Sequence, residues 1–253
     1  MNIEVSDLSI VLPAFLAGLV VLVTHVPLGA QVLKRGIVFI DLAIAQIAAL
    51  GVILAGMTGA EPHGWLIQVA AGAAAVLGAL LLIWTERRWP EVQEAQIGVL
   101  FVLAATGGLL LLAHHPHGGE HLRDLLSGQI LWVDYRQLLL PAIGSALIAL
   151  LLYFFGERLG RTGFYLVFAL AVTSSVQLVG VYLVFASLII PSLGARAWRA
   201  RLRLPVAFLI GIGGYAIGLV CSTLFDLPSG ALIVWCLAAV AAMIHAWGAR
   251  AEG

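Results

Sequence analysis

The sequence predicts an all-helical protein that crosses a membrane many times, and two observations carry this prediction. Of the 253 residues, 62% are hydrophobic and only 10% are charged, with a mean hydropathy of +1.08. A soluble domain is nearer half apolar and about a quarter charged. In addition, apolar stretches of close to twenty residues recur along the chain, which is the helix length that spans about 30 Å of hydrocarbon. These features exclude a soluble enzyme, a nucleic-acid-binding domain and a disordered scaffold.

Seven stretches have the length and apolar composition of single membrane helices. In chain order they are residues 8–26, 36–57, 65–84, 97–113, 138–155, 205–224 and 228–247. An eighth stretch, 164–190, has 27 residues, which is long for one crossing and short for two. Its interior is interrupted by polar residues and a glycine: Thr173, Ser174, Ser175, Gln177 and Gly180. No internal repeat or linker divides the chain, so residues 1–253 are expected to form a single transmembrane domain.

The positions of the basic residues decide how the eighth stretch is used. Cytosolic loops of membrane proteins are enriched in Lys and Arg. If residues 164–190 cross once, six of the thirteen basic residues lie inside and seven outside. If the stretch returns to its starting side, eleven lie inside and two outside. We therefore expect a broken helix hairpin near residues 164–195 centred on 174–180, an outside N-terminus and a cytosolic C-terminus. The alternative is one long tilted helix with a polar kink.

The chain lacks the motifs of an enzyme. Its only lysine, Lys34, follows Leu33 rather than glycine, so no phosphate-binding Gly-Lys-Ser/Thr loop exists. No His-Glu-x-x-His or Gly-x-Ser-x-Gly motif is present. His25 and His245 lie near predicted cytosolic ends, where neither could activate a buried serine. Cys221 and Cys236 show no paired spacing. The chain is not expected to catalyse a reaction itself.

Asp41 is the one acidic residue inside an apolar segment. An ionisable group at membrane depth is costly and is therefore a candidate functional residue. The alternative is structural, because Asp41 is close enough to the cytosolic boundary to reach headgroup water or to pair with Lys34 or Arg35. Gln46 lies nearer the middle of the same segment, where it could bind a cation weakly or hydrogen-bond to a neighbouring helix. Asp41 and Gln46 are thus candidate metal contacts.

A loop on the predicted outer side contains four of the seven histidines. The cluster consists of His114, His115, His117, Glu120 and His121. Imidazole and carboxylate are the ligands that zinc prefers among nitrogen and oxygen donors. The proline and two glycines in this loop oppose a regular helix, so the loop is expected to collect metal rather than form a closed site. The alternative is a polar loop that is His-rich by composition alone.

Two short basic loops on the predicted inner side could dock a cytosolic partner. They are residues 156–163, with Glu157, Arg158 and Arg161, and residues 191–203. The alternative for their charges is simple anchoring at the membrane surface. A third inner loop, residues 86–94, has mixed charge and could also dock.

Three segments, taken in order, resemble the permease subunits of zinc/manganese/iron-type ABC importers. Residues 29–51 resemble the family's second helix, in which a basic pair precedes an Asp and a His and the run ends in glycine. Residues 126–133 are similar to its Gly-x-Ile-Leu-x-Val element. Residues 175–196 resemble its Gln-Val-Val-Gly…Ile-Pro-Ala-Ala-Thr-Ala-Arg run and are the most specific match. The resemblance extends over residues 10–247.

This resemblance implies a vitamin-B12-permease-like helical bundle of the type II ABC importers, in a bacterial inner membrane. It implies a homodimer, a separate cytosolic ATPase and a periplasmic or lipoprotein metal-binding protein. It also implies that residues 156–163 are the coupling segment that contacts the ATPase. No permanently bound cofactor is implied, only a transported divalent metal, with zinc favoured by the histidines.

The chain departs from the family at the metal-binding helix. Aligning the terminal Gly51 places Leu42 and Gln46 where the family has its Asp and His, and Asp41 comes one residue early. Asp41 and Gln46 could form a weaker site with altered metal preference, or the ion could pass with help from elsewhere. Two other functions stay open: a permease of the same fold for a metal chelate, and an ion-coupled secondary carrier that works alone.

Overall fold

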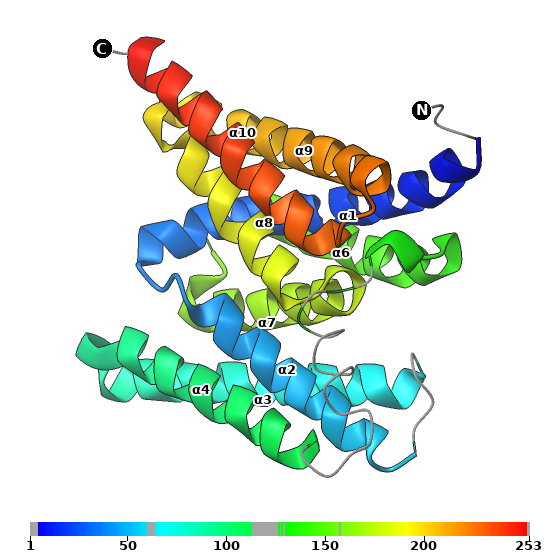
Figure 1. The fold of residues 1–253 in the computed structure, drawn as a ribbon. Helices are drawn as coiled ribbons and strands as arrows, with labels where there is room; N and C mark the ends of the chain where they lie inside the picture. Colours follow the sequence, from blue (N-terminus) through cyan, green and yellow to red (C-terminus); the bar gives the residue numbers. More distant parts are fainter. Residues whose placement is uncertain are drawn as a thin grey trace.

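The computed structural model describes residues 5–59, 64–112, 126, 128, 130–156 and 158–251, and every regular element in these residues is helical. The α-helices are α1 (Val5–Arg35), α2 (Ile40–Gly56), α3 (Trp65–Arg88), α4 (Gln93–Leu112), α6 (Tyr135–Phe155), α7 (Gly160–Val179), α8 (Val181–Gly194), α9 (Ala200–Phe225) and α10 (Ser229–Ala251). Short 3-10 turns are η1 (Pro90–Val92), η2 (Ile130–Trp132) and η3 (Ala195–Ala197). Figure 1 shows the bundle that they form.

The described helices fit the membrane prediction. Seven of them, α1, α3, α4, α6, α7, α9 and α10, are long and apolar enough to cross a membrane, whereas α2 and α8 are apolar but shorter. The predicted end of the first span at residue 26 was wrong, because α1 continues through Pro27 to Arg35. Membrane helices tolerate an internal proline where neighbouring helices and side chains satisfy the freed backbone groups.

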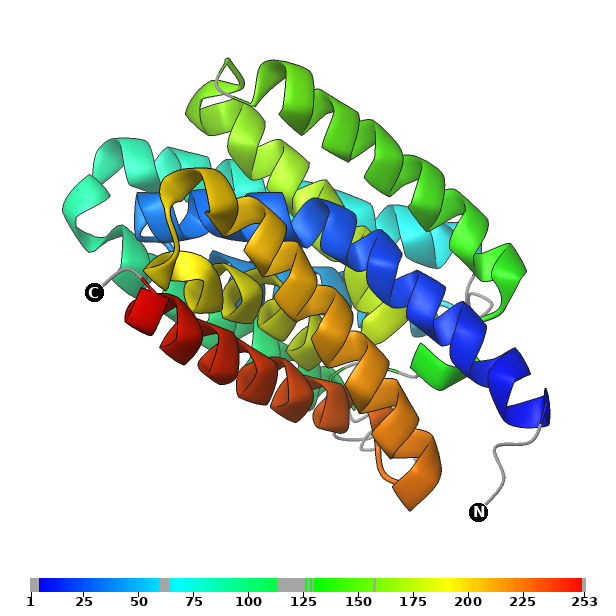
Figure 2. The same cartoon turned by 90° about the horizontal axis from the view of Figure 1, so that it is seen from above.

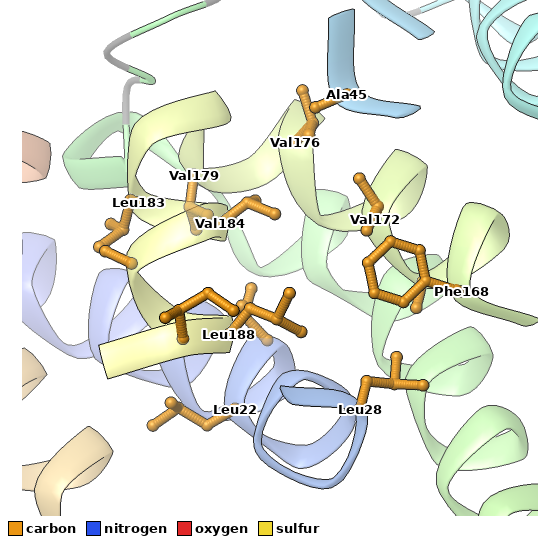
Figure 3. Packing of buried hydrophobic residues seen from close by; sticks show 14 of the residues in the cluster. Leu22, Leu28, Ala45, Phe168, Val172, Val176, Val179, Leu183, Val184 and Leu188 are labelled. Atoms are coloured by element: carbon orange, nitrogen blue, oxygen red, sulfur yellow. The ribbon is translucent and has the colours of Figure 1, made fainter. Parts of the chain in front are cut away.

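The helices form two groups with α7 between them (Figure 1). Seen from above, α9 and α10 run along one side of the bundle and α6 along the other (Figure 2). In one group α2 packs on α3 and α4, and in the other α1, α8, α9 and α10 pack together. α7 contacts α2 and α3 on one side and α1, α6 and α8 on the other. Small residues bring the backbones close, as where Gly51 of α2 faces Ala70 and Ala74 of α3. Figure 3 shows the apolar core where α1, α7 and α8 meet.

The chain breaks between α7 and α8 at Gly180, whose backbone has φ 80° and ψ 164°. A residue with a Cβ rarely adopts this conformation, so glycine is required. α7 stays a regular helix through residues 173–177, the polar segment where the sequence predicted the break. Thr173 Oγ1 donates to the Ala169 carbonyl and Ser174 Oγ to the Ala171 carbonyl. The break therefore lies at the end of the predicted interval rather than at its centre.

α8 returns the chain to the end of the bundle at which α7 begins. At that end the Arg35 guanidinium lies 4.2 Å from the centre of the Phe164 ring, which joins α1 to the start of α7. The end of α8 is close by, because Ser192 Oγ donates to the Val26 carbonyl at 3.3 Å. The end of α10 joins them through the Trp198 indole N–H, which donates to the Ile244 carbonyl.

Eleven basic residues of the described chain therefore occur at or next to helix ends on one side of the bundle, which we call the basic end. They are Lys34, Arg35, Arg87, Arg88, Arg158, Arg161, Arg196, Arg199, Arg201, Arg203 and Arg250. The ends of α1, α3, α8 and α10 are seen together on the left of Figure 1. The broken hairpin predicted from the charges is confirmed, and the single tilted helix was wrong.

Candidate functional site

Asp41 lies in the first turn of α2 and its side chain is completely buried. Neither carboxylate oxygen has a hydrogen-bond partner among the described residues. The pairing with Arg35 considered from the sequence is not formed, because that guanidinium lies over the Phe164 ring. Lys34 is exposed at the end of α1, whereas Asp41 is sealed from solvent. A buried carboxylate without a partner has a large energetic cost, so the burial is better explained by function than by stability.

Gln46 is also buried, with 6% of its side chain exposed, but it does not share a face with Asp41. Residues five apart on an α-helix point about 140° apart around its axis. Ala45, four residues after Asp41, does share that face. Figure 3 places Ala45 beside Val176 of α7. Asp41 is thus on the side of α2 that faces α7, while Gln46 points along a different flank.

Besides the Asp41 oxygens, six buried side-chain atoms lack a partner in the described part of the chain. Three are on α1 and α7 (His25 Nε2, Ser175 Oγ and Gln177 Nε2), and three are on α3 and α4 (Glu86 Oε2, Glu94 Oε2 and Gln96 Oε1). Most buried polar groups in proteins are hydrogen-bonded, so each exception needs an explanation. Ser175 differs from Ser174 and Thr173, whose hydroxyls donate to carbonyls one turn back. The unsatisfied atoms of His25, Asp41 and Ser175 belong to α1, α2 and α7, three helices whose apolar faces contribute to one core.

His25 lies ten residues before the end of α1 and next to Val26, whose carbonyl accepts from Ser192 near the end of α8. The imidazole is completely buried and its Nδ1 lies 3.0 Å from the Val21 carbonyl oxygen. A proton on Nδ1 donates to that carbonyl and leaves Nε2 as an acceptor. Gly18, Leu22 and Gly29 occupy the same face of α1, and they contact α8 and α9. His25 is therefore a buried nitrogen donor that the sequence reasoning missed.

Several predicted site residues lie outside the described residues. These are His114, His115, His117, Glu120, His121 and Glu157. Within the described ranges no group of three or more His, Cys, Asp or Glu side chains is close enough to hold a metal ion. The metal-collecting role of the His-rich loop and the docking role of Glu157 therefore stay predictions.

The predicted docking residues Arg158 and Arg161 lie at the basic end. Arg158 is exposed, and its backbone N–H donates to the Phe155 carbonyl. Arg161 Nε lies 3.3 Å from Glu86 Oε1 at the end of α3. The neighbouring Thr162 accepts a 2.9 Å hydrogen bond from Arg87. The first turn of α7 is thus fastened to α3, and Arg158, in the loop before α7, is exposed.

Comparison with known proteins decides the family. The model of the ABC 3 transport family matches residues 7–164 and 157–247. The chain belongs to the ABC 3 transport family. The resemblance to metal ABC importer permeases is thereby confirmed, and the chain is a multi-pass, non-catalytic membrane permease. Family membership also implies an ATPase and a binding protein as partners, and it excludes a carrier that works alone.

Among its relatives are two metal transport proteins. The manganese transport system membrane protein MntC of Halalkalibacterium halodurans is 27% identical over 230 residues, covering 82% of this chain and 76% of the relative. The high-affinity zinc uptake system membrane protein ZnuB of Haemophilus influenzae is 24% identical over 250 residues, covering 90% and 94%.

Solved structures confirm the predicted fold. PsaBC from Streptococcus pneumoniae, solved in complex with a Fab, has a TM-score of 0.75 at 20% identity and covers 92% of this chain and 89% of its own. A metal-chelate type ABC transporter in an inward-facing conformation has a TM-score of 0.69 at 18% identity, with coverages of 96% and 89%. At this identity the likeness is one of fold alone.

Proposed function

We propose that this chain is the membrane permease of an ATP-driven importer that moves divalent metal ions into the cytoplasm, and that Asp41 contacts the passing ion. The observation that carries the proposal is the fully buried carboxylate of Asp41, whose two oxygens have no partner within the described residues. Relatives named for manganese and for zinc transport support the class of substrate.

The chemistry of the buried polar side chains bears on the choice of ion. The carboxylate oxygens of Asp41 suit manganese, whereas an imidazole nitrogen, as on His25, suits zinc. His25 is the buried imidazole in the described helices that lacks a partner at one nitrogen. The zinc preference expected from the histidines therefore depends on His25 and on the loop at residues 114–121. A conduit needs only weak binding, because tight binding would slow release.

The basic end is proposed to face the cytoplasm of a bacterial inner membrane, which puts the C-terminus inside and the N-terminus outside. The support is the gathering of eleven of the thirteen basic residues at this end. The ATPase would dock here, with Glu157, Arg158 and Arg161 at the contact. The binding protein would approach the opposite end, and a second copy would complete a homodimer.

The test is an Asp41→Asn variant in cells that lack the native chain, with uptake of zinc, manganese and iron measured separately. The amide keeps the shape of the side chain and removes its charge, so we expect uptake to fall at least about tenfold, the loss of one charged contact, with expression and unfolding temperature unchanged. Asp226→Asn is the matched control, since Asp226 is an exposed acidic residue with φ 51°, a conformation that asparagine tolerates.

Normal uptake of all three ions by the Asp41→Asn variant would contradict a contact role and leave Asp41 as a structural group. The chelate alternative is tested in the same cells. Growth rescued by a metal chelate but not by the free ion would assign the permease to chelates.

The loop at residues 114–121 has its own test. Deleting it should reduce uptake only when the metal is scarce, because a collecting loop raises the local concentration of the ion rather than the transport rate. An equal loss at every concentration would argue against that role.

A further inference from the structure

An open pocket of about 700 Å³ lies at the basic end between the last turns of α1 and α6. Its described lining consists of Gln31, Lys34, Arg35, Leu152, Tyr153, Phe154, Gly156 and Arg158. Both helices end at this pocket, which is the level at which we expect lipid headgroups to meet water.

The lining is strongly basic. Lys34, Arg35 and Arg158 contribute three positive charges, and no carboxylate is among the described lining residues. Arg161 differs, because it lies in the first turn of α7, outside the pocket lining, and pairs with Glu86. Arg35 is held in place by the Phe164 ring, which contacts the guanidinium without neutralising it.

The other wall of the pocket belongs to a helix whose apolar surface is largely exposed. α6 is apolar, and only a small part of it is buried against the rest of the bundle. At its end Tyr153 is 83% exposed and Phe154 62% exposed. Exposed aromatic side chains at a helix end are typical of the membrane–water interface. The pocket thus joins a cationic wall to a surface that contacts lipid.

We propose that this pocket binds the phosphate of an anionic phospholipid from the leaflet at the basic end. Basic pockets between membrane helices on the cytoplasmic side are suited to phosphate headgroups. The bound phosphate joins Lys34 and Arg35 of α1 to Arg158 of the loop before α7. It thereby orders the loop that is proposed to meet the ATPase, and it does so whichever ion is transported.

The test uses the purified full-length chain in detergent, titrated with short-chain phosphatidylglycerol and, separately, with short-chain phosphatidylcholine. Bound lipid is counted by native mass spectrometry. We expect phosphatidylglycerol to bind and phosphatidylcholine not to bind. The double variant Lys34→Gln/Arg158→Gln should weaken phosphatidylglycerol binding about 30-fold, the combined share of two basic residues at a membrane surface.

Arg196→Gln/Arg201→Gln is the matched control, because it removes the same charge from exposed positions at the same end but outside the pocket. It should leave phosphatidylglycerol binding unchanged. Equal losses in the two double variants would overturn the proposal in favour of unspecific attraction to a basic surface. Undiminished binding by the pocket variant would overturn it as well.

Two other occupants are distinguished by further measurements. If inorganic phosphate displaces phosphatidylglycerol at similar concentration, the pocket is a site for free anions and not for lipid. If a Tyr153→Cys variant, made in a Cys221→Ala/Cys236→Ala background, forms disulfide-linked dimers in the membrane, a second copy covers the pocket. Either result would overturn the proposal.

Discussion

Gly18→Ala should destabilise the fold by displacing the ring of Tyr215. Gly18 of α1 packs directly on α9, and a Cβ added there would lie 2.6 Å from Tyr215 Cε1. The Tyr215 ring is completely buried, so it has little room to move. Its hydroxyl lies 2.8 Å from Ser187 Oγ on α8. Shifting the ring therefore stretches the hydrogen bond that joins α9 to α8.

The expected loss of unfolding free energy follows from these contacts. Forcing a methyl group into a packed core costs about 1–3 kcal/mol. A weakened buried hydrogen bond adds about 1 kcal/mol, for a total of about 2–4 kcal/mol. Tyr215→Phe alone should cost only about 1 kcal/mol, because Ser187 Oγ keeps its own acceptor, the Leu183 carbonyl, at 2.6 Å. With both changes the loss should be about 1 kcal/mol smaller than the sum, since the hydrogen bond can be lost only once.

The unfolding free energy would be measured by titrating the micelle-bound protein with SDS and following circular dichroism. Gly72→Ala is the control, because nothing lies within 4 Å of a Cβ added there. If Gly18→Ala and Gly72→Ala shift the transition equally, the close packing of α1 on α9 described above is wrong. Strict additivity with Tyr215→Phe would refute the coupling through Ser187.

Three further predictions concern the α7 region. Gly180→Ala should lower the unfolding free energy by about 1–3 kcal/mol, measured in the same titration, because φ 80° and ψ 164° suit only glycine; a neutral result would contradict the break. Gln93→Leu should cost about 2–3 kcal/mol by the same measurement, since it removes three buried hydrogen bonds that join α3, α4 and α7; a loss as small as that of the glycine control would refute this. Arg161→Gln should lower the unfolding free energy by less than about 1 kcal/mol. The Arg161 side chain is 55% exposed, and an ion pair that is open to solvent contributes little to stability. A large drop in metal uptake by that variant would then come from docking, and unchanged uptake would contradict a docking role for Arg161.

The sequence predicted most of the helical architecture, because a continuous apolar run in a membrane protein has few other structures available to it. The charge count also predicted the return of the chain between α7 and α8. Details that depend on the neighbouring helices were missed. Pro27 does not end α1, and the break falls at Gly180 rather than among Ser174 and Ser175.

The candidate site was predicted only in part. Asp41 was recognisable because a carboxylate in an apolar run is rare. Its separation from Gln46 could have been read from their spacing of five residues, which puts them on different flanks of one helix. His25 and Ser175 could not be found in this way. Whether a polar side chain hydrogen-bonds to a carbonyl of its own helix depends on its rotamer and its packing, and the sequence pattern predicts neither.

The turn at Gly180 also decides on which face of the bundle each terminus lies. Since α8 brings the chain back, the nine α-helices of the described residues pass an odd number of times between the two faces of the bundle. Val5 and Ala251 consequently finish on opposite faces, as the N and C labels of Figure 1 show. With the proposed orientation, a fluorescent reporter and an affinity tag fused to the two ends would occupy different compartments, and neither could substitute for the other.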